Sequence, residues 1–351
     1  MNDKTLFQLP IIESTTDSRL QTRLQHKIDH KTKPQGALGL LEGLALQLGL
    51  IQRSESPSLR EPQMVVFAAD HGIAAEGVSA YPQAVTVQMV ANMLAGGAAI
   101  NVFARQHGFA LQVVDAGVAA DLPAHPRLLA RKIAHGTRNS CLEPAMTRPQ
   151  AEAALAAGGQ IVQTLPGNVV AFGEMGIANT SPAALLLTRL TVAPIADVAG
   201  RGTGLDDQQL RHKQSVLMRS LARHPATQPL DALAELTTLG GFEIAMMTGA
   251  MLQAASERRV VLVDGFIAGA AALVACALMP QVRGYLVFCH RSAETGHRLL
   301  LKHLKATPLL ELDLRLGEGT GALLAWPLLQ SAANFLNEMA SFESAGISEK
   351  Q

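Results

Sequence analysis

The stretch MVVFAADHG, residues 64–72, places six apolar residues directly before an aspartate, a histidine and a glycine. Similar short runs, apolar or mostly apolar, recur along the chain, and segments compatible with helices separate them. Uninterrupted apolar runs of this length are typical of strands buried on both faces, as in parallel sheets covered by helices. The runs occupy residues 64–69, 111–114, 168–172, 260–263, 285–288 and 309–314. The sequence therefore predicts a three-layer, Rossmann-like α/β fold with a mostly parallel sheet flanked by helices.

Polar residues and glycines follow every one of these runs. In open α/β sheets, ligands bind outside the carboxyl ends of the strands, so we expect all six turns to line one crevice. The last turn holds a single acid, Glu318, between two glycines. The turns are Asp70-His71-Gly72, Asp115-Ala116-Gly117, Gly173-Glu174-Met175-Gly176, Asp264-Gly265, His290-Arg291-Ser292 and Leu316-Gly317-Glu318-Gly319.

The charge of the chain is balanced: among 351 residues, 29 lysines and arginines face 29 aspartates and glutamates. This balance argues against nucleic acid or an anionic membrane as a partner and favours small molecules. The longest uncharged segment, residues 265–282, contains Pro280 and suits a buried helix better than a membrane span. Residues 1–17 show no secretory signal pattern, and three cysteines without a C-x-x-C pair favour a cytoplasmic location.

The two ends of the chain differ from its middle. Residues 18–30 and 37–52 show helical patterns, and so do residues 321–342, where Pro327 predicts a kink. The polar stretch 53–62 has the composition of a linker. We therefore expect a small helical domain, made of residues 1–60 and 315–351, beside a large nucleotide-binding catalytic domain of residues 61–314.

Two turns have the composition of anion sites. In residues 172–185, Ser181 is placed to cap a helix that begins at Pro182, so backbone N–H groups would face a phosphate. In residues 199–213, Gly202 and Gly204 permit close backbone approach, Asp206 or Asp207 is placed to cap the next helix, and Lys213 would supply a cation. Each turn alone also fits an ordinary tight turn.

Several common sites are absent from the sequence, which has no P-loop motif, no dinucleotide fingerprint and no G-x-S-x-G elbow. His26 and His30 lie four residues apart, but a solvated helix face explains them better than zinc. Residues 260–271 partly resemble the motif of transferases that use phosphoribosyl pyrophosphate. Asp264 lacks the second acid and the hydroxyls that magnesium pyrophosphate would need, so no metal site is predicted.

Longer segments, taken together and in order, resemble one enzyme family over nearly the whole chain. They are KPQGALGLLE (33–42), residues 67–106, GEMGIANTSPAALL (173–186), GRGTGLDD (200–207), LGGFEIAMMTGAMLQAA (239–255), VLVDGFIAGAAALVA (261–275), CHRSAETGH (289–297) and residues 312–342. The family is that of the nicotinate-nucleotide:5,6-dimethylbenzimidazole phosphoribosyltransferases, which act in assembly of the nucleotide loop of cobalamin. The chain departs from the family at Ala178 and Pro182, where glycine and a small residue are expected.

The resemblance implies that nicotinate mononucleotide and 5,6-dimethylbenzimidazole yield α-ribazole 5′-phosphate and nicotinate, by displacement with inversion at C1′. It also implies a reaction without a cofactor, and homodimers. The residues by themselves leave two alternatives open: a transferase that uses phosphoribosyl pyrophosphate, and a non-catalytic nucleotide-binding module.

The family's proposed general base falls on Glu318. A carboxylate within reach of the benzimidazole N–H would accept its proton during attack, and the flanking glycines would let the acid approach the ring. From the residues alone, an acid that complements the dipole at a helix N-terminus explains Glu318 equally well.

The resemblance assigns further roles, each of which also has a purely structural explanation. Asp264 could instead cap a turn, and Arg291 could be a structural ion-pair partner. The predicted benzimidazole pocket comprises Ser79, Tyr81, Gln88, Met89 and Leu316. The predicted ribose and phosphate contacts are Glu174, Gly176, Asn179, Thr180, Ser181, Gly202, Lys213, Gly265 and Ser292.

Overall fold

A six-stranded sheet forms the centre of the computed structural model, which describes residues 7–226 and 228–348. Its order is β3-β2-β1-β4-β5-β6, and every pair of neighbouring strands is parallel. The strands are β1 (Gln63–Ala69), β2 (Ala110–Gly117), β3 (Leu128–Ala130), β4 (Val169–Met175), β5 (Val260–Val263) and β6 (Leu286–Phe288). Five of the predicted apolar runs are these strands, so the predicted parallel α/β sheet is confirmed.

The sixth predicted strand, residues 309–314, is wrong. Within the described residues, this segment makes only one isolated bridge, in which Leu310 pairs with His290 beyond the end of β6. The backbone then leaves the sheet, because Asp313 has φ +52°, which no strand can contain. β3 escaped prediction because it has only three residues, none of them buried, so no apolar run marks it.

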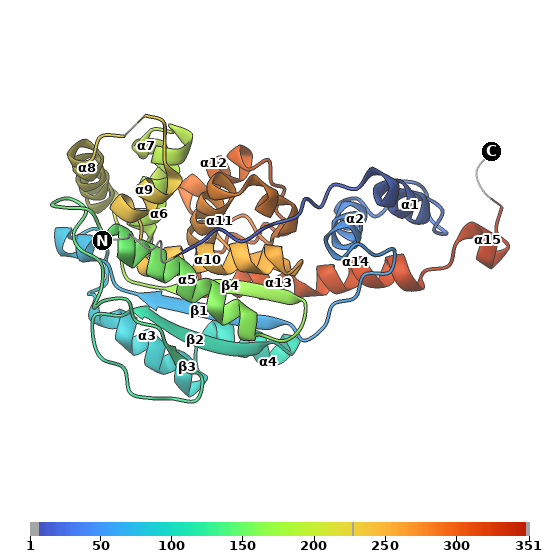
Figure 1. Ribbon diagram of the computed structural model, residues 1–351, viewed down its shortest axis with the longest axis horizontal. Helices are drawn as coiled ribbons and strands as arrows, with labels where there is room; N and C mark the ends of the chain where they lie inside the picture. Colours follow the sequence, from blue (N-terminus) through green and yellow to red (C-terminus); the bar gives the residue numbers. More distant parts are fainter. Residues whose placement is uncertain (1–6, 227, 349–351) are drawn as a thin grey trace.

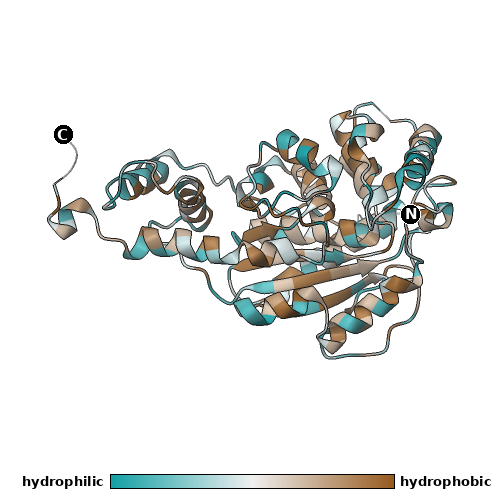
Figure 2. Cartoon of the chain, turned by 180° about the vertical axis from the view of Figure 1, so that it is seen from behind, coloured by the Kyte–Doolittle hydropathy of each residue, from teal (hydrophilic) through white to brown (hydrophobic). Residues whose placement is uncertain are grey.

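Helices cover both faces of the sheet and give three layers (Figure 1). One face carries α3 (Ala84–Ala95), α4 (Ala99–His107) and α13 (Thr320–Leu324), and the other carries α10 (Phe242–Ser256) with α5 (Arg148–Thr164) packed outside it. Figure 2 shows that the strands between them are mostly hydrophobic. The remaining helices of the α/β body are α6 (Thr180–Thr191), α7 (Ile195–Val198), α8 (Asp207–Arg223), α9 (Ala232–Leu239), α11 (Phe266–Leu278), α12 (Thr295–His303) and the 3₁₀ helices η1 (Gly72–Glu76) and η2 (Pro280–Tyr285).

Of the described residues, only the stretch Ala84–His107 is long and apolar enough by composition to cross a membrane. It consists of two helices, since Gly96 ends α3 in the left-handed conformation and Ala98 is extended before α4. The uncharged segment 265–282 contains the buried helix α11, as predicted.

The predicted helices near the two chain ends are present at one end of the molecule, where α2 packs against both α1 and α14 and α15 stands apart beyond α14 (Figure 1). They are α1 (Ser18–Asp29), α2 (Leu40–Gln52), α14 (Trp326–Glu338) and the short α15 (Phe342–Ala345). Pro327 does not kink a continuous helix: α13 ends at Leu324 and Pro327 stands in the first turn of α14, where its missing N–H costs nothing. The division into two domains stays a prediction, and its ends 1–6 and 349–351 lie outside the described residues.

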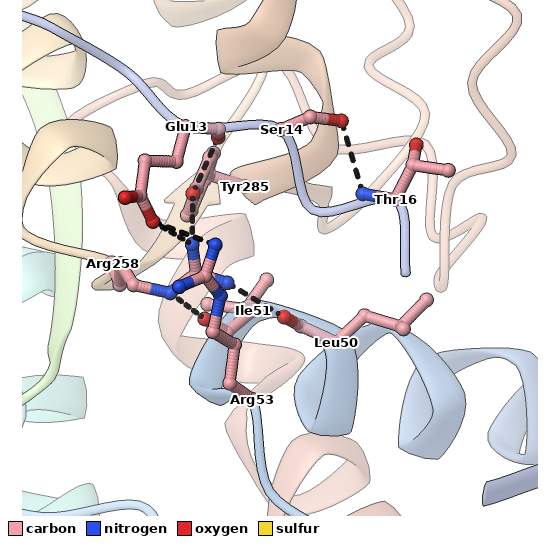
Figure 3. A network of polar contacts seen from close by, with 8 residues as sticks. All are labelled: Glu13, Ser14, Thr16, Leu50, Ile51, Arg53, Arg258 and Tyr285. Atoms are coloured by element: carbon pink, nitrogen blue, oxygen red, sulfur yellow. Dashed lines mark hydrogen bonds and ion pairs between the residues drawn. The ribbon is translucent and has the colours of Figure 1, made fainter. Parts of the chain in front are cut away.

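Arg258 ties this helical end to the α/β body (Figure 3). Its guanidinium donates to the carbonyls of Leu50 and Ile51 in the last turn of α2, each at 2.9 Å. It also pairs with Glu13 at 3.2 Å and donates to the hydroxyl of Tyr285 at 3.1 Å. Since Arg258 follows α10, one side chain connects the N-terminal segment, α2 and the body.

Candidate active site

A pocket of about 380 Å³ opens at the carboxyl ends of the strands, next to the β1/β4 switch point of the sheet. Four of the six predicted turns line it, namely those after β4, β5 and β6 and the loop that carries Glu318. The expectation that all six would do so is wrong, because within the described chain the turns at 70–72 and 115–117 supply none of its lining. His71 points inward instead, where its Nε2 lies 2.9 Å from Glu243 Oε1.

The loop that carries Glu318 has an unusual backbone. Gly317, Glu318 and Gly319 have φ values of +80°, +64° and +93°, so three consecutive residues are left-handed. Glycine adopts this conformation freely, whereas for an L residue such as Glu318 it is costly. The loop also lies directly against β4, since a Cβ on Gly173 would stand 2.1 Å from the carbonyl oxygen of Glu318. Position 173 of β4 therefore has to be glycine for the loop to lie close enough that Glu318 reaches the pocket.

The carboxylate of Glu318 lines the pocket although only 4% of the residue is exposed. Its Oε2 accepts a hydrogen bond of 3.1 Å from the backbone N–H of Ile100, in the first turn of α4. Its Oε1 makes no hydrogen bond to the described part of the chain. Burial raises the pKa of Glu318 and the nearby charge of Asp264 raises it further, while the Ile100 N–H opposes both. The arrangement is that of an oriented base with one oxygen available.

Glu174, near the end of β4, is the second acid of the pocket. Burial raises its pKa to about 8; the side-chain amide of Asn179, which donates to Oε2, lowers it, and Asp264, Glu243 and Glu318 raise it. A pKa raised in this direction favours the protonated form of Glu174, and a protonated carboxyl group can donate a hydrogen bond as well as accept one.

The turn after β4 differs from its prediction. α6 begins at Thr180 after Asn179, and the hydroxyl of Ser181, predicted as the cap, is buried without a hydrogen-bond partner among the described residues. Pro182 is the third residue of the helix rather than the first. Ala178 has φ +75°, a conformation that glycine adopts more freely, which accounts for the expectation of glycine at this position.

The second predicted anion turn lies beside the first. Of the two predicted caps, Asp206 and Asp207, it is Asp206 that caps α8, accepting from the backbone N–H of Gln209 at 2.8 Å. Lys213 is fully buried, and its ammonium donates to the hydroxyl of Thr180 at 2.8 Å and to the carbonyl of Gly200 at 3.1 Å. Burial lowers the pKa of Lys213 to about 8, and Glu294 opposes that change. The cation thus stands behind the pocket wall and reaches it through Thr180.

Most of the predicted site residues are brought together. Ser79 lies outside the lining, in a neighbouring surface pocket that Tyr81 shares, and Gln88 is exposed on α3. Ser181 and Lys213 are buried behind the wall. The pocket is lined by the predicted residues Tyr81, Met89, Glu174, Gly176, Asn179, Thr180, Gly202, Gly265, Ser292, Leu316 and Glu318.

Sequence reasoning missed several lining residues. Val85 precedes Met89 by one helical turn, so the i, i+4 spacing on α3 was a signal that could have found it. Arg315 carried no such signal, because only the folded loop turns it to the pocket. The other missed residues are Ile177, Thr203, Phe266, Ile267, Ala268 and Glu294, whereas Met175, Asp264, His290 and Gly317 belong to turns that were predicted to line the crevice but had no individual role.

Three smaller expectations about charged side chains can be checked. Arg291 pairs with Glu311 at 3.0 Å, the structural role considered for it. His26 and His30 stack on each other along α1 with ring centroids 3.8 Å apart. Within residues 7–226 and 228–348, no group of three or more histidine, cysteine or acidic side chains is placed to hold a metal ion.

The lining of the pocket combines apolar and polar residues. Val85, Met89 and Leu316 give one part an apolar lining, which suits a flat ring. Thr180, Gly202 and Ser292 add polar groups and backbone to the lining, and the buried ammonium of Lys213 lies behind Thr180. A ligand with an aromatic ring and an anionic group would satisfy both, and Glu318 would face it.

Known proteins resemble this chain along nearly its full length. A family model described as a phosphoribosyltransferase matches residues 14–347. The nicotinate-nucleotide–dimethylbenzimidazole phosphoribosyltransferase of Cupriavidus necator is 63% identical over 95% of this chain and 96% of its own length. That of Variovorax paradoxus is 58% identical over 97% of each chain. The crystal structure of CobT from Thermus thermophilus, 44% identical, superposes with a TM-score of 0.91 over 95% of this chain and all of its own.

Proposed function

The chain belongs to the nicotinate-nucleotide–dimethylbenzimidazole phosphoribosyltransferase family, and from that premise we propose how its pocket performs the transfer. The enzyme is a pentosyltransferase that moves the phosphoribosyl group of nicotinate mononucleotide to 5,6-dimethylbenzimidazole, giving α-ribazole 5′-phosphate and nicotinate. The observation that supports our mechanism is the buried carboxylate of Glu318, oriented by Ile100 through one oxygen and open to the pocket through the other.

The nitrogen of the benzimidazole attacks C1′ of the ribose from the face opposite the nicotinate. The C1′–N bond to nicotinate breaks, and its electron pair cancels the positive charge of the pyridinium ring. Attack makes the benzimidazole cationic, and Glu318 accepts its N–H proton through Oε1. A positioned general base of this kind contributes about 10² to 10⁴ in rate. Displacement from the opposite face inverts C1′ and gives the α anomer.

We assign the apolar and the polar residues of the lining to the two substrates. The apolar part, with Met89, Leu316 and the previously unassigned Val85, holds the benzimidazole, and Tyr81 stands at its mouth with 53% of its surface exposed. Thr180 and Ser292 hold the nucleotide and its phosphate, with Lys213 acting through Thr180. The predicted roles of Ser79, Gln88 and Ser181 stay predictions, because these residues lie outside the lining.

The test is a product assay with purified protein, nicotinate mononucleotide and dimethylbenzimidazole that resolves the α and β anomers. We expect nicotinate release that depends on the benzimidazole and continues in a chelator. Glu318→Gln should lower turnover about 10²- to 10⁴-fold while nucleotide binding persists. Glu338→Gln, an exposed acid at the end of α14, is the matched control. Unchanged turnover in Glu318→Gln refutes the assigned base, and a β product refutes direct displacement.

We also propose that the enzyme is a cytoplasmic homodimer, as its family resemblance implies. Leu40 and Leu312 are each more than half exposed, which leaves apolar surface for a second copy. The three cysteines are free thiols, as expected in a reducing compartment. Light scattering after size-exclusion chromatography tests the dimer, and a mass of 37.1 kDa at micromolar concentration would contradict it.

A further inference from the structure

Asp264 contacts the loop of the general base directly. It follows β5, is 3% exposed, and its carboxylate accepts two backbone hydrogen bonds from the chain just after Glu318. Oδ2 accepts from the N–H of Gly319 and Oδ1 from the N–H of Ala322, each at 3.1 Å. Both N–H groups belong to the first turn of α13 or its cap, so the carboxylate also complements the start of that helix.

The bonds from Asp264 help to hold the left-handed conformation of the loop. A left-handed residue other than glycine costs about 1–2 kcal/mol, and it persists only where the surroundings hold it. Inside the loop, the hydroxyl of Thr320 donates to the carbonyl of Gly317 at 2.9 Å, which closes the turn but does not fix its place in the fold. Asp264 supplies that second constraint from a strand end, and charge-assisted bonds of this type are the stronger ones.

We propose that Asp264 is a positioning residue for the transfer reaction, whose carboxylate holds the left-handed loop so that Glu318 meets the benzimidazole N–H. The inference rests on the proposed role of Glu318 as the base. Two independent elements then set the base: β5 fixes its main chain through Asp264, and the first turn of α4 fixes its side chain through Ile100. Asn101 braces that turn, since its side chain bonds Ala98 N and Met93 O.

The negative charge of Asp264 also affects the pKa of Glu318. Glu318 faces Asp264 from β5 and Glu174 from β4, while α4 offers it only the backbone N–H of Ile100. His290 Nε2 lies 3.4 Å from Asp264 Oδ1 on the other side of that carboxylate, and Arg315 lines the same pocket. Because Asp264 raises the pKa of Glu318, its neutralisation should move the acid limb of the rate profile to lower pH.

Asp264→Asn is the main test. The carboxamide has one acceptor oxygen and would turn its NH₂ group toward a backbone N–H, so one bond to the loop is lost. We expect kcat to fall about 10²-fold, KM for nicotinate mononucleotide to change by no more than a few-fold, and the acid limb of kcat/KM to shift to lower pH. Asp264→Glu keeps the negative charge but moves the carboxylate by one methylene, so its bonds to the loop are misplaced. For this variant kcat should fall while the acid limb of kcat/KM stays in place.

A double variant separates positioning from a general structural role. If Asp264 acts through Glu318, the variant Asp264→Asn/Glu318→Gln should be no slower than Glu318→Gln alone, because the base is already absent. Asp313→Asn, an exposed aspartate on the same segment, should keep the wild-type kcat and pH profile. Saturable binding of nicotinate mononucleotide, measured calorimetrically for every variant, shows that the pocket is intact.

The outcomes distinguish this inference from the assignment of the base. If Glu318→Gln keeps the wild-type turnover, Glu318 is not the base, and the positioning role of Asp264 is refuted with it. A collapse in Glu318→Gln beside a wild-type kcat and acid limb in Asp264→Asn overturns the positioning role alone. Rate losses that multiply in the double variant also overturn it, because Asp264 would then act independently of Glu318.

Discussion

At the scale of single residues, the pocket concentrates buried acids. Glu174, Asp264 and Glu318 come from β4, β5 and the loop before α13, and each is less than a tenth exposed. Carboxylates this close cannot all carry charge cheaply, so at least one of them holds a proton. The three carboxylates have unequal surroundings: among the described residues, Asp264 accepts two backbone N–H bonds, Glu318 accepts one, and Glu174 accepts the side-chain amide of Asn179 alone.

The pH dependence of the rate should report this arrangement. Glu318 has to be deprotonated to accept a proton, and burial raises its pKa above the ordinary value of 4.5. As pH falls through that raised pKa, kcat/KM should decline, and the decline should begin above the pH at which an exposed glutamate titrates. A pH–rate profile measured with saturating nicotinate mononucleotide checks this. An acid limb centred at or below 4.5 would contradict the burial argument.

Glu174 should affect stability rather than only turnover. The pKa of Glu174 is 4.5 in the unfolded chain and about 8 in the folded protein. Between pH 4.5 and 8, the folded state therefore binds one proton more at Glu174 than the unfolded state does. Stability linked to Glu174 is therefore present below pH 4.5, decreases as pH rises and is lost above 8. Glu174→Gln, neutral throughout, should raise Tm by several degrees at pH 8.5 and little at pH 5. Glu338→Gln is the control, and an equal Tm change at both pH values would contradict the prediction.

At the scale of elements, close backbone approach decides how α5 and α10 pack. A Cβ on Gly158 of α5 would stand 1.9 Å from the carbonyl oxygen of Met246 on α10, and one on Gly249 of α10 would stand 2.0 Å from that of Leu155. The two helices therefore touch through glycines from both sides. Since α10 lies directly on the sheet, this contact sets how closely the outer helix of that face can approach.

Adjacent glycines of α5 offer a matched test. Gly158→Ala should lower the free energy of unfolding by about 1–3 kcal/mol or more, because the methyl group meets backbone that cannot move alone. Gly159→Ala meets nothing closer than the Cβ of Gln253 at 3.7 Å, so it should gain about 0.5–1 kcal/mol from helix propensity. Urea unfolding measures both. Equal effects of the two substitutions would show that the helices are not in this contact.

At the scale of the whole molecule, the helical end depends on a few connections to the α/β body. Trp326, the one tryptophan in the sequence, begins α14 and packs edge-on against Phe109 with ring centroids 5.0 Å apart. Arg258 makes the second connection, at the C-terminal turn of α2. Both link segments that lie far apart in the chain.

Arg258→Gln should lower the free energy of unfolding by about 1–3 kcal/mol, because two carbonyls at the end of α2 lose charged donors. Arg53→Gln is the control: Arg53 pairs with the same Glu13, but its side chain is 54% exposed, and such pairs contribute about 1 kcal/mol or less. Urea unfolding followed by tryptophan fluorescence measures both variants. A larger loss in Arg53→Gln would contradict the role given to Arg258.

Particular segments show which strands and helix caps the sequence could predict. The runs at 64–69 and 260–263 became strands because they are buried on both faces, a condition that continuous apolar residues express locally. Residues 309–314 have a similar composition but follow the sheet for a single bridge, since what stops them is the positive φ at Asp313. Of the two predicted caps of α8, Asp206 is the one used, whereas Ser181 does not cap α6, because that helix begins at Thr180, two residues before the predicted start.

The amino-acid sequence by itself determined the parallel α/β sheet and the strand ends from which most of the pocket is built, since hydrophobic runs and turn residues are local signals, whereas the role of Glu318 as a base came from the family resemblance and stays a prediction. Tertiary structure alone decided that Ile100 orients Glu318, that Asp264 holds its loop and that Lys213 stands behind Thr180. Each of these contacts joins residues more than thirty positions apart, so it exists only after the strands and helices have packed and water has been excluded from between them.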